Sequence, residues 1–295
     1  MKTISIVLVT YNAQHYIESC LDSIFKQGFR EYEIIVIDNA SQDTPKSLIK
    51  NRYIDITLIE NRENFGACYA RNQGIRKAKG EFILFLDHDV ILLNNFLKKI
   101  YQAIESNYNI GAAGAKILLN DKKTIYSAGI HFSWLWRFSD IGSGKIDSPK
   151  FNHRKFVFGV SQAAALYRRE ALESIRQGEE YFDKDFFYFF EDVDVCWRLQ
   201  KKGWKILYTP EAECLHIAGR SRNKDRVSQY LCMRNRYLMI IKNESPFGLL
   251  RFSIVFFVYD FWRNLFMVMI NPWYFLKGLF EVARLVPKMI RKRFY

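Results

Sequence analysis

The fold is decided by residues 82–89, which read Phe82-Ile83-Leu84-Phe85-Leu86-Asp87-His88-Asp89. A short, nearly continuous apolar run is typical of a strand that is covered on both faces, as in a parallel sheet. The run ends in two carboxylates, Asp87 and Asp89, which can together reach one cation that prefers oxygen ligands, such as Mg²⁺ or Mn²⁺. The alternative for this acidic end is a solvated turn in which Asp makes local hydrogen bonds.

Three similar runs precede this stretch, at residues 4–10, 32–38 and 54–60. Helical patterns lie between the runs, at residues 14–26, 45–50 and 66–79. Strands that alternate with helices through short links predict an α/β fold with a doubly wound, mainly parallel sheet. Regular patterns return later, with a strand at 156–167, helices near 169–176 and from Glu191, and a short strand at 205–208.

Polar residues follow each of the first four strands. They are Thr10, Tyr11 and Asn12 after the first, Asp38 after the second, Asn64 and Gly66 after the third, and Asp87 and His88 after the fourth. In open α/β sheets, ligands bind beyond the carboxyl ends of the strands. Asp38 can accept a hydrogen bond from a base or a ribose, Gly66 allows close backbone approach, and Arg71 can reach an anion. The chain contains neither a dinucleotide-binding glycine motif nor a Walker A motif.

A second acidic motif, Glu191-Asp192-Val193-Asp194, follows the aromatic run 186–190 and opens a predicted amphipathic helix. Carboxylates beside so apolar a stretch are costly unless they are paired or used. They fit a general base that is held next to a hydrophobic pocket. Acidic residues in a first helical turn also interact favourably with the helix dipole, which is the alternative.

His216 follows the short strand 205–208 and is the third candidate ligand. A neutral imidazole commonly joins carboxylates around an ion such as Mn²⁺, whereas a structural histidine is the alternative. The basic residues that come next either neutralise phosphate or form an exposed loop; they are Arg220, Arg222, Lys224 and Arg226.

The composition of the chain narrows the classes of molecule that it is expected to bind. The chain of 295 residues is 49% hydrophobic and carries a net charge of +13, which predicts an anionic partner such as nucleic acid, phospholipid or a phosphorylated ligand. We expect no nucleic acid, because no zinc-finger, helix-turn-helix or RNA-binding motif occurs. The five scattered cysteines predict neither a zinc site nor a disulfide framework. The first residues predict no signal peptide, so we expect a protein of the cytosol or of the cytosolic face of a membrane.

Taken in order, these motifs resemble the family 2 glycosyltransferases. The matching pieces are Val9-Thr10-Tyr11-Asn12, Ile37-Asp38-Asn39-Ala40-Ser41, Asn64-Phe65-Gly66, Gly80-Glu81-Phe82, Asp87-His88-Asp89, Phe182-Asp183-Lys184, Glu191-Asp192-Val193-Asp194, Gly203-Trp204, Pro210 and His216-Ile217-Ala218-Gly219-Arg220-Ser221. The resemblance covers roughly residues 3–225. Within the family, the chain looks most like bacterial rhamnosyltransferases that build O-antigen, capsule or exopolysaccharide.

The resemblance implies a GT-A fold and a metal-dependent, inverting transfer from a nucleoside-diphosphate sugar to a saccharide acceptor, with the acceptor linked to a polyprenyl lipid. It implies that Asp89 and His216 ligate Mn²⁺ or Mg²⁺, while Asp192 is the catalytic base and Glu191 positions nearby groups. Asp38 would hold the nucleobase and Asp87 the ribose side. The rest of the donor site would comprise Thr10, Tyr11, Asn12, Asn64, Gly66, Arg71 and His88.

Two other interpretations use a similar fold. A sugar-phosphate nucleotidyltransferase usually carries a glycine-rich loop near the first strand, where this chain has Thr10-Tyr11-Asn12-Ala13-Gln14. An inactive membrane-bound subunit would be expected to lack a metal or base carboxylate, yet Asp89, Asp192 and His216 are all present.

Trp134 and Trp136 lie in an irregular segment between residues 120 and 157. Aromatic faces stack on sugar rings, so we expect both residues to face the acceptor, with burial in the core as the alternative.

The composition changes after residue 228, which predicts a catalytic domain (1–228) and a helical, aromatic-rich C-terminal region (229–295). Residues 249–270 are strongly apolar, but Arg251, Asp260 and Arg263 interrupt them, which favours an interfacial helix over a membrane-spanning one. The last 19 residues carry a net charge of +5. This predicts peripheral binding to anionic lipid on the cytoplasmic face of the inner membrane. A helical hairpin that packs on the catalytic domain or forms a dimer contact is the alternative.

Overall fold

The computed structural model describes residues 3–43, 45–218 and 226–294. Its first half is a parallel sheet in the order β3-β2-β1-β4. The strands are β1 (Ile4–Thr10), β2 (Tyr32–Asp38), β3 (Ile56–Glu60) and β4 (Phe82–Asp87). The apolar part of β4 is buried throughout, as its sequence predicts. β3 begins two residues later than predicted, and Ile54 before it is exposed.

The sheet continues beyond β4 with an antiparallel strand. β11 (Ala164–Arg168) runs antiparallel to β4 on one side and to β6 (Ile110–Leu119) on the other, and β12 (Lys205–His216) then pairs with β6 in parallel. The shorter strands are β5 (Val90–Leu92) and β10 (Lys155–Phe156) on β12, β7 (Ile125–Ser127) on β6, and the separate hairpin β8 (Ile130–Phe132) and β9 (Phe138–Asp140). The α/β fold is thus confirmed, with a sheet that is parallel in its first half and mixed beyond β4.

Two strands differ from the prediction in extent. The predicted strand 156–167 divides into β10 and β11. The strand predicted at 205–208 continues to His216 because its register shifts between Thr209 and Glu213, which accommodates Pro210 at the irregularity. This extension carries His216 to the edge where β4 ends.

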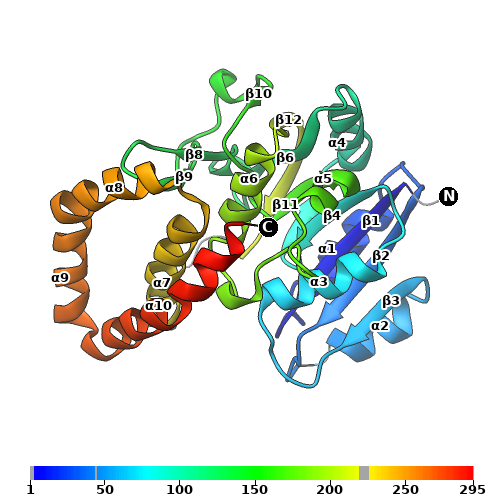
Figure 1. Ribbon diagram of the computed structural model, residues 1–295. Helices are drawn as coiled ribbons and strands as arrows, with labels where there is room; N and C mark the ends of the chain where they lie inside the picture. The colour runs from blue at the N-terminus through cyan, green and yellow to red at the C-terminus, as the bar shows by residue number, and fades with distance from the viewer. Residues whose placement is uncertain (1–2, 44, 219–225, 295) are drawn as a thin grey trace.

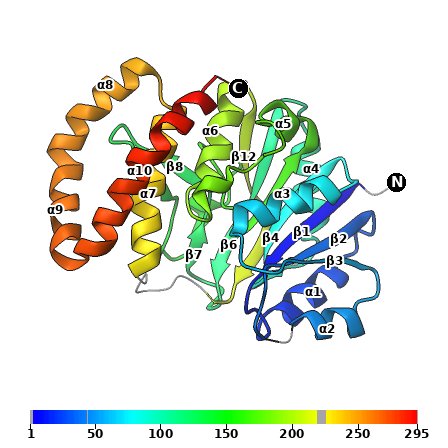
Figure 2. The same ribbon diagram turned by 60° about the horizontal axis from the view of Figure 1, so that its bottom comes forward.

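Helices cover both faces of the sheet (Figure 2). On one face lie α1 (Ile17–Phe25), α2 (Pro45–Arg52) and α4 (Phe96–Glu105), packed on Ile4, Ile6 and Leu8 of β1. On the other lie α3 (Ala67–Lys77), α5 (Arg169–Ser174) and α6 (Glu191–Lys201), in one core with Val7. Successive side chains of a strand point to opposite faces, so β1 serves both cores. The sheet is doubly wound, as predicted.

The C-terminal helices extend away from the sheet and return to it (Figure 1). They are α7 (Arg226–Asn243), α8 (Pro246–Val255), the π-helical turn η3 (Phe256–Asp260), α9 (Phe261–Ile270) and α10 (Pro272–Lys292). α10 packs along α7, and we call the closed arrangement of α7 to α10 the helical frame. Leu238, Met239 and Ile240 of α7 belong to the second core. The frame is therefore anchored in the α/β region, and the division at residue 228 stays a prediction.

Asp260 holds the outer part of the frame to α7. The residue is fully buried, and its carboxylate lies 2.7 Å from the guanidinium of Arg236. Arg263 lies 4.0 Å from the same carboxylate, so the two residues share one side of the helix, as their spacing predicts. That side faces α7, which explains how an acidic residue is accommodated in so apolar a segment.

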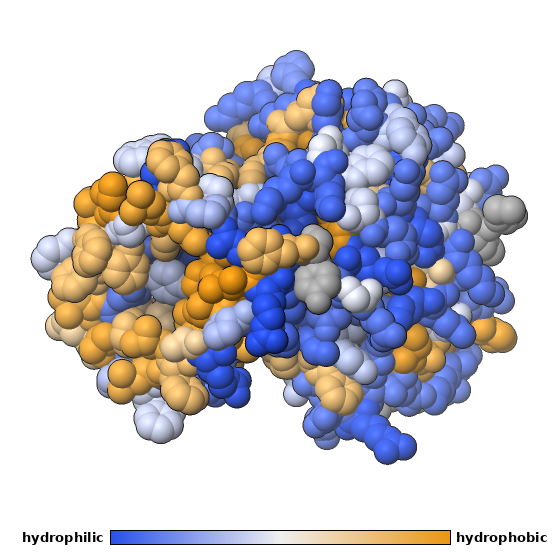
Figure 3. Space-filling model, viewed as in Figure 1, coloured by the Kyte–Doolittle hydropathy of each residue, from blue (hydrophilic) through white to orange (hydrophobic). Residues whose placement is uncertain are grey.

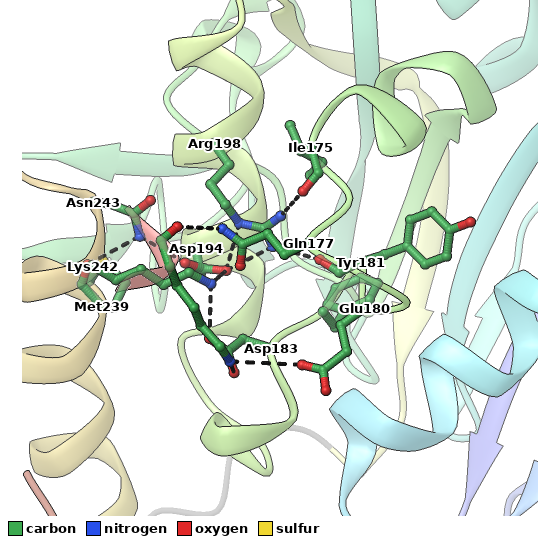
Figure 4. Close-up of polar contacts among 12 residues, drawn as sticks. Ile175, Gln177, Glu180, Tyr181, Asp183, Asp194, Arg198, Met239, Lys242 and Asn243 are labelled. Carbon is green, nitrogen blue, oxygen red and sulfur yellow. Dashed lines mark hydrogen bonds and ion pairs between the residues drawn. The ribbon is translucent and has the colours of Figure 1, made fainter. Parts of the chain in front are cut away.

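A buried network of charged groups joins α7 to the α/β region (Figure 4). The Lys242 ammonium lies 3.0 Å from both Asp183 and Asp194. Asp194 also pairs with Arg198 at 2.8 Å, and Lys292 at the end of α10 pairs with Asp183. Burial opposes ionisation of the two carboxyl groups, but these cations hold the pKa of Asp183 and of Asp194 below the usual value. Asp194 is thus a structural member of the acidic motif.

Replacing Lys242→Ala should lower the free energy of unfolding by about 3 kcal/mol, because it leaves two buried carboxylates short of a partner. Denaturant unfolding followed by circular dichroism measures this change. Lys98→Ala, on the exposed side of α4, is the control and should change stability by less than about 0.5 kcal/mol. An unchanged midpoint for Lys242→Ala would show that the network does not stabilise the fold.

Candidate functional site

Strand pairing brings the first acidic motif to His216. The chain turns at Asp87-His88-Asp89 and enters β5, which runs antiparallel to the end of β12 with Val90 opposite His216. The Ile217 amide donates to the Asp89 carbonyl at 2.9 Å. As a result, ligand atoms of Asp87, Asp89 and His216 all lie within 4.8 Å of one another.

The donor set fits a divalent cation. His216 Nδ1 lies 3.1 Å from Asp89 Oδ2, yet this buried nitrogen makes no hydrogen bond within the part of the chain that the structure describes. The Tyr126 ring stacks on the imidazole with centroids 4.4 Å apart. Burial and the neighbouring Asp87 raise the pKa of Asp89, against the opposing effect of His216. Two carboxylates and an imidazole suit Mn²⁺ or Mg²⁺, and a cation here would compensate this negative charge.

Arg71 joins this cluster to the second acidic motif. Its side chain is buried, and its guanidinium lies 2.5 Å from Glu191 Oε1 and 3.4 Å from Asp87 Oδ1. Burial alone would lower the pKa of Arg71, but the two carboxylates raise it, so the guanidinium stays charged. Glu191 Oε2 is buried with no hydrogen-bond partner among the described residues. Glu191 thus keeps an unused hydrogen-bond acceptor beside Asp192.

Asp192 has the properties of a proton acceptor. Its Oδ1 accepts a hydrogen bond from the Val193 amide at 2.8 Å. Burial, together with repulsion from Glu191 and Asp140, raises the pKa of Asp192 to about 8. A carboxyl group whose pKa lies near the working pH takes a proton efficiently in its ionised form. Asp140, at the end of β9, was not predicted, since nothing in its sequence spacing marks it.

The backbone before this motif is strained. Phe187, Phe189 and Phe190 all have positive φ angles, of 66°, 70° and 66°, and such conformations cost about 1–3 kcal/mol each in bulky residues. The amide nitrogen of Asn235 in α7 offsets this cost by donating to the carbonyl oxygens of Phe186, Tyr188 and Phe189 at 2.8, 2.8 and 2.9 Å. Asn235 thus holds the turn that positions Glu191 and Asp192, and the sequence alone gave no signal for it.

The residues predicted after β1 and β2 lie together. Thr10 and Asp38 are fully buried at paired ends of the two strands. The Asn12 amide donates to Ser41 Oγ at 3.0 Å, and Tyr11 is 45% exposed. The buried Thr10 hydroxyl has no hydrogen-bond partner within the described residues. This group of polar residues lines the same edge as Asp87.

Asn64, Gly66 and His88 also lie at this edge. Asn64 Oδ1 accepts hydrogen bonds from the Asn39 side chain at 2.7 Å and from the Gly66 amide at 3.0 Å. Gly66 has a φ of 85°, and a Cβ there would lie 2.5 Å from the Phe187 ring. Only glycine therefore lets α3, with Arg71, approach the strained turn. His88 is half-buried, with Nδ1 3.3 Å from the Val9 carbonyl.

The two tryptophans behave differently. Trp134, between β8 and β9, is 73% exposed and free to contact a ligand. Trp136 is only 5% exposed, donates to Glu244 at 2.6 Å and packs edge-on against Phe252 of α8. Burial leaves Trp136 little surface for a sugar, so the core alternative fits it better.

The predicted phosphate-neutralising residues Arg220, Arg222 and Lys224 lie outside the described residues, and Arg226 begins α7.

Replacing Asn235→Asp keeps the shape of the side chain but removes its two N–H donors. We expect faster hydrogen exchange in residues 186–190 and a fall in turnover of up to about 10²-fold, the effect of displacing a catalytic group by about 1 Å. Asn107→Asp is the control, because Asn107 only accepts a hydrogen bond, from the Asn109 amide. Parental exchange and turnover in Asn235→Asp would contradict the role given to this residue.

The solved structures that share this fold include two that contain Mn²⁺. A crystal structure of GalNAc-T7 with UDP, GalNAc and Mn²⁺ superposes with a TM-score of 0.65 at 18% identity, covering 82% of this chain and 48% of that one. The mannosyltransferase PcManGT from Pyrobaculum calidifontis, in complex with GDP-Man and Mn²⁺, superposes with a TM-score of 0.58 at 17% identity, covering 96% and 75%. The GT-A fold that the resemblance implied is confirmed.

Sequence comparison extends this likeness. Poly-β-1,6-N-acetyl-D-glucosamine synthase of Staphylococcus aureus (strain COL) is 26% identical over 219 residues, which are 72% of this chain and 50% of that protein. The chain thus spans about half the length of the curated relatives that it matches over this region. The sequence model of the family described as "Glycosyl transferase family 2" matches residues 5–176. That match includes β1 to β4, Arg71 and the Asp87-His88-Asp89 turn, and the chain therefore belongs to glycosyl transferase family 2.

Proposed function

We propose that this glycosyltransferase is a metal-dependent, inverting enzyme that moves a sugar, with rhamnose the leading candidate, from a nucleoside-diphosphate donor to a lipid-linked saccharide in cell-surface polysaccharide synthesis. The observation that carries the proposal is the contact of Arg71 with both Asp87 and Glu191. Through Glu191, this contact joins the cluster of Asp87, Asp89 and His216 to the neighbouring Asp192, whose pKa is raised.

The donor would lie along this edge. Asp38 and the residues around Thr10 and Asn64 would bind the nucleoside, and Asp87 would accept a hydrogen bond from the ribose. Asp89 and His216 would hold Mn²⁺ or Mg²⁺, which stabilises the negative charge of the departing diphosphate when it is bound.

The acceptor would approach from the side of the β8–β9 hairpin. Asp192 in its ionised form would take the proton of the attacking hydroxyl, and the free Glu191 oxygen would orient that group. Inversion needs one such base, whereas a retaining glycosidase needs two carboxyl groups.

The known proteins support this proposal. The S. aureus relative is named as a polysaccharide synthase, and both superposed structures contain Mn²⁺ with a nucleotide or nucleotide sugar. The alternatives are a nucleotidyltransferase, which would release pyrophosphate from a nucleoside triphosphate and a sugar 1-phosphate, and an inactive subunit, which would release no product.

We also propose that the helical frame binds the cytoplasmic face of the membrane. Within the described residues, one helix, 246–270, is long and apolar enough to cross a membrane, and little of it is buried. Figure 3 shows the apolar surface of the frame. Lys288 and Lys292 pair with Asp185, so part of the predicted basic charge docks α10 on the α/β region. Because Asp260 is also buried against α7, peripheral attachment fits the frame better than a free span.

Chelation should abolish transfer, and Mn²⁺ or Mg²⁺ should restore it, because Asp89 and His216 offer a partly built cation site. The assay incubates the protein with thymidine- and uridine-diphosphate sugars and detects free nucleoside diphosphate. Asp89→Ala should weaken binding of the donor only when metal is present. Full activity in excess chelator would contradict the proposal. Release of pyrophosphate from a nucleoside triphosphate and a sugar 1-phosphate, with no nucleoside diphosphate formed from the nucleotide sugars, would indicate a nucleotidyltransferase.

Asp192→Asn should lower turnover by about 10²–10⁴-fold with donor affinity nearly unchanged, as for a lost general base. In the parent, kcat/KM for the acceptor should rise with pH until Asp192 ionises near its pKa of about 8. A folded-state pKa raised above the unfolded value means that ionisation of Asp192 opposes folding increasingly from about pH 4 to 8. Asp192→Asn should therefore gain more stability over the parent at pH 8 than at pH 5.

Asp194→Asn is the matched variant for this test. Asp194 lies in the buried network with Lys242 and Arg198. Its replacement should therefore lower the free energy of unfolding, and turnover should fall only in proportion to the fraction of protein that is unfolded. A stably folded, inactive Asp194→Asn protein beside an active Asp192→Asn protein would show that the base has been assigned to the wrong carboxylate.

The full chain should sediment with vesicles that contain phosphatidylglycerol at moderate salt. Replacing Phe266→Asp and Met269→Asp together should weaken this binding by about tenfold or more, because each buried apolar side chain contributes about 1.5–3 kcal/mol. Phe156→Asp is the control, since Phe156 is similarly exposed but lies on β10. Attachment through the frame would be contradicted if the Phe266→Asp, Met269→Asp protein sedimented as fully as the parent. It would also be contradicted if the parent did not sediment at all.

A further inference from the structure

The helical frame encloses an apolar cavity of about 470 Å³. All four of its helices contribute to the walls, including Ile241 of α7, Phe252 of α8, Leu265 and Val268 of α9, and Leu279 of α10. The polar groups of Tyr237 and Asn264 also reach the cavity, but they hydrogen-bond to each other at 2.9 Å. The walls therefore offer a ligand almost nothing but hydrocarbon.

Such a cavity is suited to an apolar occupant. Water gains few hydrogen bonds inside it, and apolar cavities in proteins stay dry or bind apolar molecules. The outer side of the same helices is also apolar, with Phe257, Phe266, Met269 and Trp273 each at least 60% exposed. An occupant that arrives from a bilayer can thus pass from the membrane to the cavity without crossing a polar surface.

Two cations lie where the β8–β9 hairpin meets the helical frame. Arg251 of α8 lies over the Trp136 ring at 5.6 Å, and Arg137 of the hairpin lies over the Tyr259 ring of η3 at 5.1 Å. Neither guanidinium makes an ion pair with a carboxylate among the residues that the structure describes. Both are exposed, so they are available to an anion such as a phosphate at the end of a hydrocarbon chain.

A continuous set of contacts then leads to the base. Phe252 lines the cavity and packs on Trp136 at 5.7 Å. Trp136 belongs to the β8–β9 hairpin, which ends in Asp140, and Asp140 is close enough to raise the pKa of Asp192. Contacts thus connect the apolar cavity, through the hairpin beside the two cations, to the proposed base.

We propose that the cavity holds the hydrocarbon chain of the phosphate-bearing lipid that carries the acceptor saccharide. This inference rests on the proposed function, since it names the carrier of the same acceptor. The order of the three features matches the order of chain, phosphate and sugar in such a lipid. A second copy of this protein could also cover the apolar walls, but it would not explain why Arg137 and Arg251 lie beside the cavity.

The test is photolabelling of the full chain with an isoprenyl phosphate that carries a diazirine on its chain, followed by peptide mapping. Label is expected on cavity residues such as Leu265 and Ile241. Val268→Trp, which fills the cavity, should reduce labelling by about tenfold, equivalent to 1.4 kcal/mol of affinity. Leu276→Trp is the matched control, because Leu276 of α10 is 60% exposed and does not line the cavity.

Two further arms identify the occupant. Arg137→Ala with Arg251→Ala should reduce labelling by the isoprenyl phosphate but leave labelling by the corresponding isoprenol unchanged. Excess unlabelled isoprenyl phosphate should compete, whereas an equal amount of phosphatidylglycerol should not.

Label spread over the outer face, labelling unaffected by Val268→Trp, or equal competition by phosphatidylglycerol would each overturn the proposal. So would cross-links between two copies through the cavity residues. Each of these experiments measures lipid binding in the absence of a nucleotide-sugar donor, so no glycosyl transfer takes place. Failure of the proposed glycosyl transfer therefore leaves this result intact, and failure here leaves the catalytic proposal standing.

Discussion

The site depends on one buried guanidinium. Arg71 reaches from α3 to Glu191 on one side and to Asp87 on the other. Without its charge, the carboxylates of the two acidic motifs would face each other in a largely buried space, at a high electrostatic cost. The same charge lowers the pKa of Asp192 against the effects of burial and of Glu191. Arg71 therefore allows the proposed cation ligands and the proposed catalytic base to share one edge of the sheet.

The position of Arg71 is fixed in turn by the packing around α3. Gly66 brings the start of this helix against Phe187, and the Cys68 amide donates to the Phe187 carbonyl at 3.1 Å. The strained turn that contains Phe187 is held by Asn235 of α7. The C-terminal helices thus support the turn before Glu191 and Asp192, in addition to forming the proposed membrane contact. This dependence also explains why α7 is anchored by so many buried charges.

Much of this arrangement could be predicted from local sequence. The apolar runs identify the four parallel strands, and the polar residues after them identify the edge where we propose that the donor binds. The pairing of Asp89 with His216 was anticipated through family resemblance, whereas its physical cause is the register of β5 on β12. For the second acidic motif, the local sequence pattern is compatible both with a general base and with a stabilising interaction with the helix dipole. Only the structure separates Asp194, buried among cations, from Asp192, whose pKa is raised.

The remaining features depend on contacts between distant residues. Arg71 and Glu191 are 120 positions apart, and no periodicity links them. Asn235 and Asp140 have no motif of their own, so their positions follow only from how α7 and the β8–β9 hairpin pack. The burial of Trp136 depends on Glu244 and Phe252, which the sequence places more than 100 residues away. The charge of α10 suggested lipid, while part of it binds Asp183 and Asp185.

The central claim is that both acidic motifs form one metal-assisted catalytic centre around Arg71. Anomalous X-ray scattering from crystals grown with Mn²⁺ and a nucleoside diphosphate tests it most directly. The account predicts one manganese peak coordinated by Asp89 and His216, with Arg71 still between Asp87 and Glu191 and with Asp192 free of metal. A peak on Asp192 and Glu191, or no peak near Asp89 at saturating Mn²⁺, would contradict it.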